Sequence, residues 1–212
     1  MVNAIEIIGV SKIINDYSIL SNINLTIPTG EIWGLYGPNG SGKSMLLKMI
    51  CGLVNVSKGE IRIEGKPVGY KGALPDSMGI LIEQPGLLSN LSAYSNLQTL
   101  ADIKRIANES MIQIALDTVG LSWLDKRPVG KYSLGMRQKV GIAQAIFELP
   151  RVVLLDEPTN NLDEESCLRL VENLKNLNKQ YNMTICVVSH QKQQLEDLCS
   201  RITYIADGKI VG

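Results

Sequence analysis

The stretch EIWGLYGPNGSGKSMLLKMI, residues 31–50, holds an apolar run, a glycine-rich segment and a second apolar run. Its centre, GPNGSGKS at 37–44, matches the pattern G-x(4)-G-K-[ST] in full. EIWGLY predicts a strand, and Leu46, Leu47 and Ile50 share one side of a predicted helix. Glycines between a strand and a helix let successive backbone N–H groups point at phosphate oxygens, and the helix start adds its positive dipole end. The segment therefore predicts a phosphate-binding loop.

Each part of this loop suits the binding of a nucleoside triphosphate. We expect Lys43 to reach the β- and γ-phosphates, and Ser44 to bind Mg²⁺ through its hydroxyl. The alternative is a glycine-rich turn that binds nothing, which the match of both spacing and context disfavours. The predicted nucleotide-binding residues of the loop are Gly37, Pro38, Asn39, Gly40, Ser41, Gly42, Lys43 and Ser44.

A second motif, VVLLDE at 152–157, supplies acidic groups. Its apolar run is typical of a strand that is buried on both faces. Asp156 is expected to hold the magnesium ion, and Glu157 to polarise the attacking water as general base. A strand that ends in acids is a common surface feature when it occurs alone. Together with the phosphate loop it predicts a site that hydrolyses ATP.

The only histidine, His190, follows the predicted strand TICVVSH. That strand is expected beside residues 152–156, a position that permits contact between the imidazole and the γ-phosphate. A lone histidine beside an apolar strand is often purely structural, so this alternative stays open.

The rest of the chain alternates between predicted strands and helices. Further strands are expected at 4–10, 22–27, 59–65 and 78–83. From about Leu87 to Phe147 the pattern is helical, with one helix face formed by Ile112, Ala115, Leu116 and Val119 before Gly120. A later helix carries Leu168, Val171, Leu174 and Leu177 at intervals of three, and Asp207-Gly208 predicts a hairpin. Strands alternating with helices, with a helical insert midway, indicate an α/β core with a small helical lobe.

Composition limits the classes of partner. The 212 residues suffice for one substantial domain, and 21 basic residues balance 21 acidic ones, so no nucleic-acid partner is expected. The four cysteines lack CxxC spacing and are expected to be buried, reduced thiols. The first residues lack the pattern of a signal peptide, and no run reaches the roughly 18 apolar residues of a spanning helix. Any role at a membrane would then require a partner.

One more motif, YSLGMRQ at 132–138, resembles the signature of ABC-transporter ATPases, usually written LSGGQ. With GPNGSGKS, Gln84 after MGILIE, LLDEPTNNLD and VVSH, it reproduces that family's order of Walker A, Q-loop, signature, Walker B, D-loop and switch histidine. The resemblance covers nearly the whole chain. It implies an α/β fold of the ABC ATPase type: a P-loop NTPase core with a mixed sheet, an N-terminal antiparallel β subdomain and an inserted helical subdomain. It also implies one domain over 1–212, with the helical subdomain at about 87–147.

The resemblance implies further site residues. Gln84 would contact Mg²⁺ and the attacking water, although a polar residue before Pro85 is also ordinary. Asp163 would cross a dimer interface, and it also suits a helix N-cap, so both roles can hold together. Ser133 and Gly135 would face the γ-phosphate of ATP bound to a second subunit, because a helix start offers donors to an anion.

Two departures from the family pattern stand out. The signature has Leu134 where the family has glycine and Met136 where it has glutamine, a form that resembles bacterial exporters of antimicrobial peptides and drugs. The aromatic residue that usually stacks on adenine falls on Ile14, which cannot stack. Tyr17 lies nearby and is the candidate for this contact, with a surface tyrosine as the alternative.

Taken together, the resemblance predicts the ATP-binding subunit of an ABC transporter. We expect it to hydrolyse ATP with Mg²⁺ as a head-to-tail homodimer, or paired with a related ATPase subunit, and to power transport, with export favoured. A separately encoded transmembrane permease subunit would be its partner. The chain itself would be cytoplasmic and peripheral, on the inner face of the cell membrane. The alternative is an ABC-type ATPase acting on a ribosome or DNA, which the single domain and the lack of a basic surplus disfavour. A small-molecule kinase is disfavoured, because the signature and Glu157 would have no role in it. A regulatory module that binds ATP without hydrolysing it is disfavoured, because it would not need Glu157 and His190.

Overall fold

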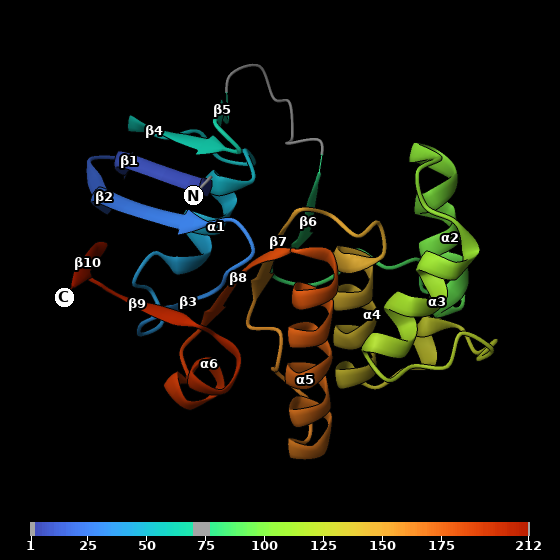
Figure 1. Cartoon of the computed structure of the whole chain (residues 1–212). Coiled ribbons are helices and arrows are strands. Elements are labelled where there is room, and N and C mark those ends of the chain that lie inside the picture. Colours follow the sequence, from blue (N-terminus) through green and yellow to red (C-terminus); the bar gives the residue numbers. More distant parts are fainter. Residues whose placement is uncertain (1–2, 70–76, 212) are drawn as a thin grey trace.

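A computed structural model describes residues 3–69 and 77–211 of the chain. The two termini of the predicted domain, at residues 1 and 212, therefore lie outside the described residues. The described chain forms two sheets, with a group of helices beside the larger one (Figure 1). This is the α/β architecture with a helical insert that the sequence predicts.

The smaller sheet is antiparallel, as expected, with the strand order β2-β1-β4-β5. Its members are β1 (Asn3–Ile14), β2 (Tyr17–Pro28), β4 (Lys58–Ile63) and β5 (Lys66–Pro67). The first two strands are longer than the predicted 4–10 and 22–27, because pairing continues to Ile14 opposite Tyr17. Between them, Asn15 and Asp16 adopt φ of 47° and 64°, the left-handed conformation that tight hairpin turns require.

The larger sheet has six strands in the order β10-β9-β3-β8-β7-β6. They are β3 (Ile32–Tyr36), β6 (Met78–Leu81), β7 (Val152–Asp156), β8 (Thr184–Ser189), β9 (Arg201–Ala206) and β10 (Lys209–Val211). Every neighbouring pair is parallel except β9 and β10, so the sheet is mixed. The predicted hairpin at Asp207-Gly208 joins that antiparallel pair, with φ of 46° and 69°.

Helices cover both faces of this sheet. They are α1 (Lys43–Ile50), α2 (Ala93–Lys104), α3 (Glu109–Thr118), α4 (Leu134–Ile146), α5 (Glu164–Tyr181) and α6 (Lys192–Leu198), with a short 3-10 turn, η1, at Val129–Lys131. The buried face of α1 joins the core shared with the antiparallel sheet, whereas α2 to α6 belong to the core on the other face. Strands β7 and β8 lie between these two cores, and all their residues are buried, as apolar central strands require.

The stripe along α5 differs from the predicted one. Leu170, Leu174 and Leu177 are buried, whereas Leu168 is 59% exposed. A helix turns once in 3.6 residues, so positions at strict intervals of three drift around its surface, and the buried face follows steps of four and three instead. The first member of the predicted stripe therefore faces away from the core.

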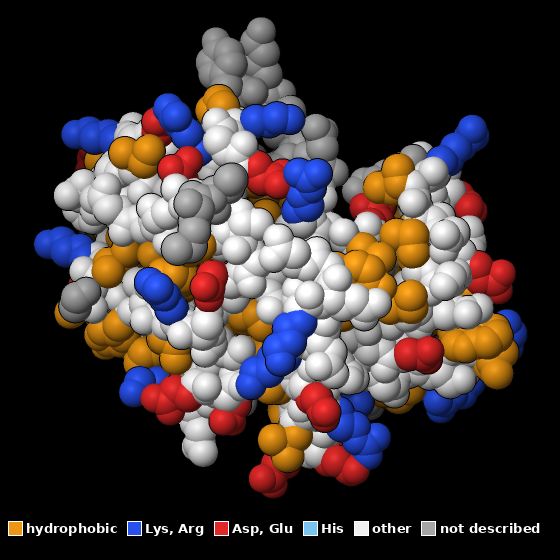
Figure 2. Space-filling model, viewed as in Figure 1, with side chains coloured by type: hydrophobic (Ala, Val, Ile, Leu, Met, Phe, Trp, Pro, Cys, Tyr) orange, Lys and Arg blue, Asp and Glu red, His pale blue; other side chains and the backbone are white. Residues whose placement is uncertain are grey.

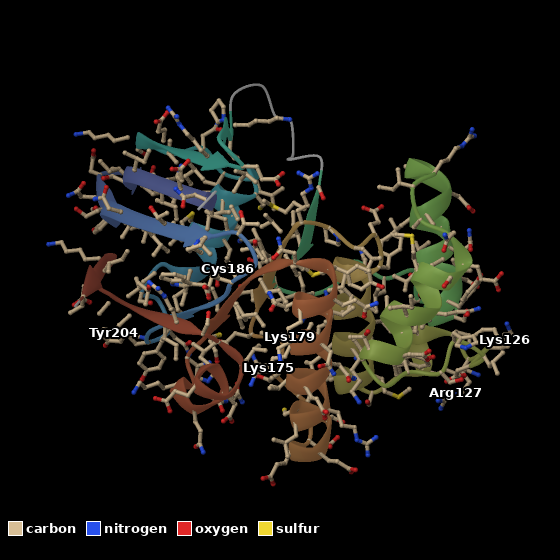
Figure 3. The ribbon with its side chains drawn as sticks, viewed as in Figure 1. Lys126, Arg127, Lys175, Lys179, Cys186 and Tyr204 are labelled. Carbon is tan, nitrogen blue, oxygen red and sulfur yellow. The ribbon has the colours of Figure 1, made fainter. Side chains whose placement is uncertain are left out.

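The cysteines are all free, but the expectation that all four are buried is wrong for two of them. Cys51 and Cys186 are buried, whereas Cys167 and Cys199 are half-buried. Cys186 lies in the central strand β8 (Figure 3), and burial raises the pKa of its thiol. Burial also raises the pKa of Cys199, to about 12.

Within residues 3–69 and 77–211, no helix combines the length and the apolar character needed to cross a membrane.

Candidate active site

The loop at residues 37–44 connects β3 to α1, between strand and helix as predicted. Gly40 and Gly42 have φ of 81° and 98°, a left-handed conformation that glycine adopts without strain. Close approach constrains the loop as well: a Cβ on Gly37 would lie 2.0 Å from the carbonyl oxygen of Ile205, and one on Gly42 would lie 2.6 Å from Leu20. The loop thus needs glycine both for its curvature and for its contacts with neighbouring strands.

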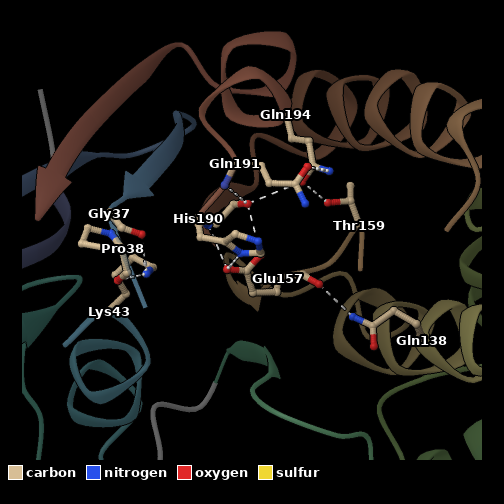
Figure 4. Close-up of polar contacts among 10 residues, drawn as sticks. Gly37, Pro38, Lys43, Gln138, Glu157, Thr159, His190, Gln191 and Gln194 are labelled. Atoms are coloured by element: carbon tan, nitrogen blue, oxygen red, sulfur yellow. Dashed lines mark hydrogen bonds and ion pairs between the residues drawn. The ribbon is translucent and has the colours of Figure 1, made fainter. Parts of the chain in front are cut away.

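The Lys43 side chain is held above this loop. Its ammonium donates to the carbonyl oxygens of Gly37 at 2.7 Å and Pro38 at 2.9 Å (Figure 4). Burial lowers the pKa of Lys43, and the nearby carboxylates of Glu157 and Asp156 oppose that shift. The lysine therefore holds its positive charge in a buried position, against two backbone carbonyl oxygens of the loop.

Asp156 ends β7 and is buried, with 7% of its surface exposed. Burial raises the pKa of its carboxyl, and a hydrogen bond with Ser44 opposes the shift. Its Oδ1 atom has no hydrogen-bond partner within the described part of the chain. A buried carboxylate oxygen without a partner is costly, and a hydroxyl and a carboxylate are the oxygen ligands that a hard divalent cation prefers. Asp156 and Ser44 therefore fit a metal ion that accompanies a phosphate.

Glu157 and His190 meet because β7 and β8 are adjacent, as expected from the sequence. Glu157 Oε1 accepts from the backbone N–H of His190 at 2.9 Å and lies 2.7 Å from its ring Nδ1. Glu157 Oε2 accepts from the hydroxyl of Ser189 at 3.1 Å. Both carboxylate oxygens of Glu157 are therefore engaged by residues at the end of β8 (Figure 4).

An open cleft of about 500 Å³ lies over the loop. It is lined by Ile19, Asn39, Gly40, Gly42, Lys43, Ser44, Met45, Glu83, Gln84, Gln138, Asp156, Glu157, Asn160 and Asn161. Most of the predicted residues in the loop, at the start of α1 and at the end of β7 thus line one cavity, and the exposed Gln84 joins them from the segment after β6. A cavity with a glycine-rich loop, a lysine and two carboxylates suits the binding of a nucleoside triphosphate.

Other predicted residues lie outside the lining of this cleft. Ser133 and Asp163 are exposed N-caps of α4 and α5, where they accept hydrogen bonds from Met136 N at 3.2 Å and Ser166 N at 2.8 Å. The capping role considered for Asp163 is therefore present. A Cβ on Gly135 would lie 2.4 Å from a backbone oxygen of Asn161, so α4 begins in contact with the segment after β7.

Tyr17 begins β2 and is 77% exposed. No aromatic side chain is among the described residues that line the cleft, where Ile19 of the same strand provides the apolar contact. Leu134 of the signature is also largely exposed, at 59%.

The protein-family model described as "ABC transporter" matches residues 20–160. The chain belongs to the ABC transporter family. It is 39% identical over 206 residues to the uncharacterized ABC transporter ATP-binding protein YybJ of Bacillus subtilis, which covers 97% of this chain and 94% of that protein. It is 39% identical to the lantibiotic transport ATP-binding protein SrtF of Streptococcus pyogenes, over 98% of this chain and 89% of that one.

Solved structures lead to the same family. The cassette MJ0796, described as a dimeric bacterial ABC transporter cassette, matches with a TM-score of 0.87 and 27% identity, over 98% of this chain and 97% of that one. The same cassette is also described in a post-hydrolysis state bound to ADP and phosphate. The chain is thus an ATP-binding subunit of an ABC transporter, and it is an ATPase with the cassette fold that the sequence predicts.

Four polar residues around Glu157 in this ABC ATPase are not predicted as site residues by any motif of the sequence analysis. Gln138 on α4 donates to the carbonyl oxygen of Glu157 at 3.1 Å, and its place within YSLGMRQ was a usable signal. Thr159, Ser189 and Gln194 form further hydrogen bonds near the same carboxylate. No signal in the sequence distinguishes Gln194 from the other glutamines of its helix.

Proposed function

We propose that this subunit binds ATP together with Mg²⁺ and hydrolyses it at a site completed by a second copy in head-to-tail orientation. The observation that carries the proposal is the meeting of Lys43, Asp156 and Glu157 at one end of the cleft. One cation and two carboxylates over a glycine-rich loop are the groups that phosphoryl transfer to water requires.

Each group at that end has a proposed task. The loop N–H groups and Lys43 bind the phosphates, and Lys43 exchanges its two carbonyl partners for phosphate oxygens. Ser44, Asp156 and Gln84 would hold Mg²⁺, which neutralises charge on the β- and γ-phosphates when bound. The Asp156 oxygen, which has no partner in the described part of the chain, supports this assignment, because a cation would remove the cost of its burial.

Glu157 acts as general base in this proposal, and His190 contacts the γ-phosphate. In the structure the carboxylate is paired with His190 and Ser189, and we expect it to turn further toward the cleft when it accepts a proton from water. His190 is 38% exposed at its side chain, which leaves the imidazole free to face a phosphate when the carboxylate turns.

The second copy supplies the residues that lie outside the cleft. Ser133, Gly135 and Asp163 sit at the starts of α4 and α5, on exposed or half-buried positions that another subunit can reach. The dimeric cassette MJ0796, at 27% identity, supports such an assembly. A homodimer or a pair with a related ATPase subunit would both satisfy this arrangement.

We further propose that this subunit binds a separately encoded membrane permease from the cytoplasmic side of the membrane. The direction of transport that we propose is export. The relatives named for lantibiotic and bacitracin transport support this direction. On the face in Figure 2, lysine and arginine alternate with aspartate and glutamate, which fits a protein rather than a nucleic-acid partner. Residues 1–212 would form one domain, with a helical subdomain at about 87–147.

The substitution Glu157→Gln tests the proposal. It removes the base and keeps the shape, so ATP turnover should fall by about 100-fold or more while ATP binding survives. An ATP-bound dimer should then accumulate on size-exclusion chromatography. Unchanged turnover would contradict the role of Glu157, and purification with a ribosome or DNA instead of a membrane protein would favour the alternative partner.

A further inference from the structure

Four side chains linked by hydrogen bonds, together with the backbone at 157–159, form a ring beside the candidate site (Figure 4). Ser189 Oγ donates to Glu157 Oε2 at 3.1 Å and also lies 3.4 Å from Gln194 Oε1. Thr159 Oγ1 donates to the same oxygen of Gln194. Thr159 is two residues beyond Glu157 in the chain, so the backbone closes the ring. Gln194, on α6, is the member that joins the two hydroxyls.

The amide of Gln194 has one orientation that satisfies its neighbours. Its Nε2 donates to Gln191 Oε1 at 2.8 Å, which turns Oε1 toward the hydroxyls of Thr159 and Ser189. Thr159 and Ser189 are both buried, at 7% and 1% exposure, so each hydroxyl needs a partner inside the protein. Gln194 Oε1 is therefore a hydrogen-bond acceptor for both hydroxyls at a place that water does not reach.

The hydroxyl of Ser189 has one proton and two acceptors for it. Its own oxygen accepts from the backbone N–H of Gln191 at 3.0 Å, which fixes where the oxygen lies. The proton can then point to Glu157 or to Gln194, but not to both at once. When Glu157 turns toward water, Gln194 gives the Ser189 proton another acceptor, and the turn leaves no buried donor unsatisfied.

We propose that Gln194 is a positioning residue that sets the orientation of the Glu157 carboxylate through Ser189. It also links that carboxylate, through Thr159, to the segment at 159–163 that we expect at the subunit interface. A movement of this segment moves Thr159, and Gln194 passes the change on to Ser189. The inference rests on the proposed function, because it needs Glu157 as general base.

The test is steady-state ATP hydrolysis by the full chain, with thermal unfolding measured on the same samples. Gln194→Met keeps the size of the side chain and removes both hydrogen-bonding groups. We expect kcat to fall about five- to tenfold while KM for ATP changes less than about twofold, because Gln194 is not among the residues that line the cleft. Gln194→Glu keeps the acceptor oxygens and should retain at least about half of wild-type kcat. Gln193→Met, an exposed neighbour on the same helix, is the matched control and should behave as wild type.

A double-mutant cycle with Thr159→Val tests the link to the segment at 159–163. If both residues act through one hydrogen bond, the double variant has the kcat of Gln194→Met alone. Fold-losses that multiply would overturn the link, and a wild-type kcat for Gln194→Met would overturn the whole inference. So would equal losses of kcat in Gln194→Met and Gln194→Glu with a matching loss of Tm, since that indicates a structural role.

Glu157→Gln is measured in the same assay and separates the two proposals. If it is inactive while Gln194→Met behaves as wild type, only the role of Gln194 fails. If it keeps wild-type turnover, the proposed function fails, and the role of Gln194 fails with it.

Discussion

At the scale of single residues, three residues other than glycine that line the cleft, Glu83, Glu157 and Asn161, have a left-handed backbone. Among them, Glu157 is the proposed general base. Its φ of 48° is in the left-handed region, which costs a residue other than glycine about 1 kcal/mol. Two hydrogen bonds hold it there: its N–H donates to Val188 O at 2.9 Å, and Gln138 donates to its carbonyl oxygen at 3.1 Å. The carboxylate therefore points back over β8, toward His190, rather than continuing along β7.

The contact with the adenine is a second question at this scale. We propose that Tyr17 moves onto the base, since 77% of its surface is exposed and it is two residues from Ile19 at the cleft. Tyr17→Ala should then weaken ATP binding by about 1 kcal/mol, roughly fivefold in Kd, because a stacked ring is lost. Isothermal titration measures this, and tripolyphosphate, which lacks a base, is the control ligand. An unchanged Kd for ATP would leave Ile19 as the apolar contact of the base.

At the scale of elements, an ion pair and a hydrogen bond hold the loop before α4 in place. Asp125 accepts hydrogen bonds from the Arg127 guanidinium at 2.7 to 3.1 Å and from the Tyr132 hydroxyl at 3.2 Å. Tyr132 immediately precedes the helix cap Ser133, so these contacts fix the chain where the signature begins. Figure 3 places Arg127 at the outer end of the helical region, far from Cys186 in the sheet.

The ion pair between Asp125 and Arg127 predicts that the stability of the fold depends on pH. The Arg127 guanidinium lowers the pKa of Asp125 from 3.8 to about 2. A lowered carboxyl pKa stabilises the folded state above the unfolded value, and this contribution is lost as the pH falls from 3.8 toward 2. Asp125→Asn should therefore be less stable than wild type at pH 6, by a small margin because Arg127 is exposed.

Urea unfolding of both proteins measures that margin. The difference in unfolding free energy should be largest near neutral pH and shrink below the ordinary carboxyl pKa. A difference that stays constant down to the lowest pH at which both proteins fold would show that the ion pair does not carry it. Leu124, its exposed neighbour, offers a control substitution to Ala.

The elements also indicate what a sequence can predict. Residues 37–44 and 152–157 are contiguous, and their chemistry is set by local order, so the loop and the acidic strand end were predictable. The buried stripe of α5 was predictable only in part, since the choice of Leu170 over Leu168 depends on where the helix meets the sheet. The ring around Gln194 depends on side-chain conformations from three separate segments, and no spacing in the sequence encodes it.

At the scale of the whole molecule, the proposed head-to-tail arrangement would divide each site between two chains. A Lys43→Ala copy lacks its own phosphate lysine but keeps its signature, and a Ser133→Arg copy keeps the lysine but blocks its signature. Each variant alone should hydrolyse no ATP above background. A mixture should recover turnover, because in the mixed dimer Lys43 of the Ser133→Arg copy meets the intact signature of the Lys43→Ala copy. Coupled-enzyme ATPase assays of titrated mixtures measure the recovery.

The control mixture pairs Lys43→Ala with Glu157→Gln. Lys43 and Glu157 act within one chain, so neither site of that mixed dimer is complete and it should stay inactive. Recovery in the control, or none in the test mixture, would contradict the proposed division of the site.

The contact between Gly37 and the Ile205 carbonyl ties the beginning of the phosphate loop to the hairpin of β9 and β10. A side chain at position 37 would fit only if the hairpin of β9 and β10 moved away. Conversely, if that hairpin were displaced, position 37 could accept residues other than glycine. Because the contact is made by a backbone oxygen, it constrains position 37 whatever side chain stands at position 205. A change that moves the hairpin of β9 and β10 would therefore also move the start of the nucleotide-binding loop.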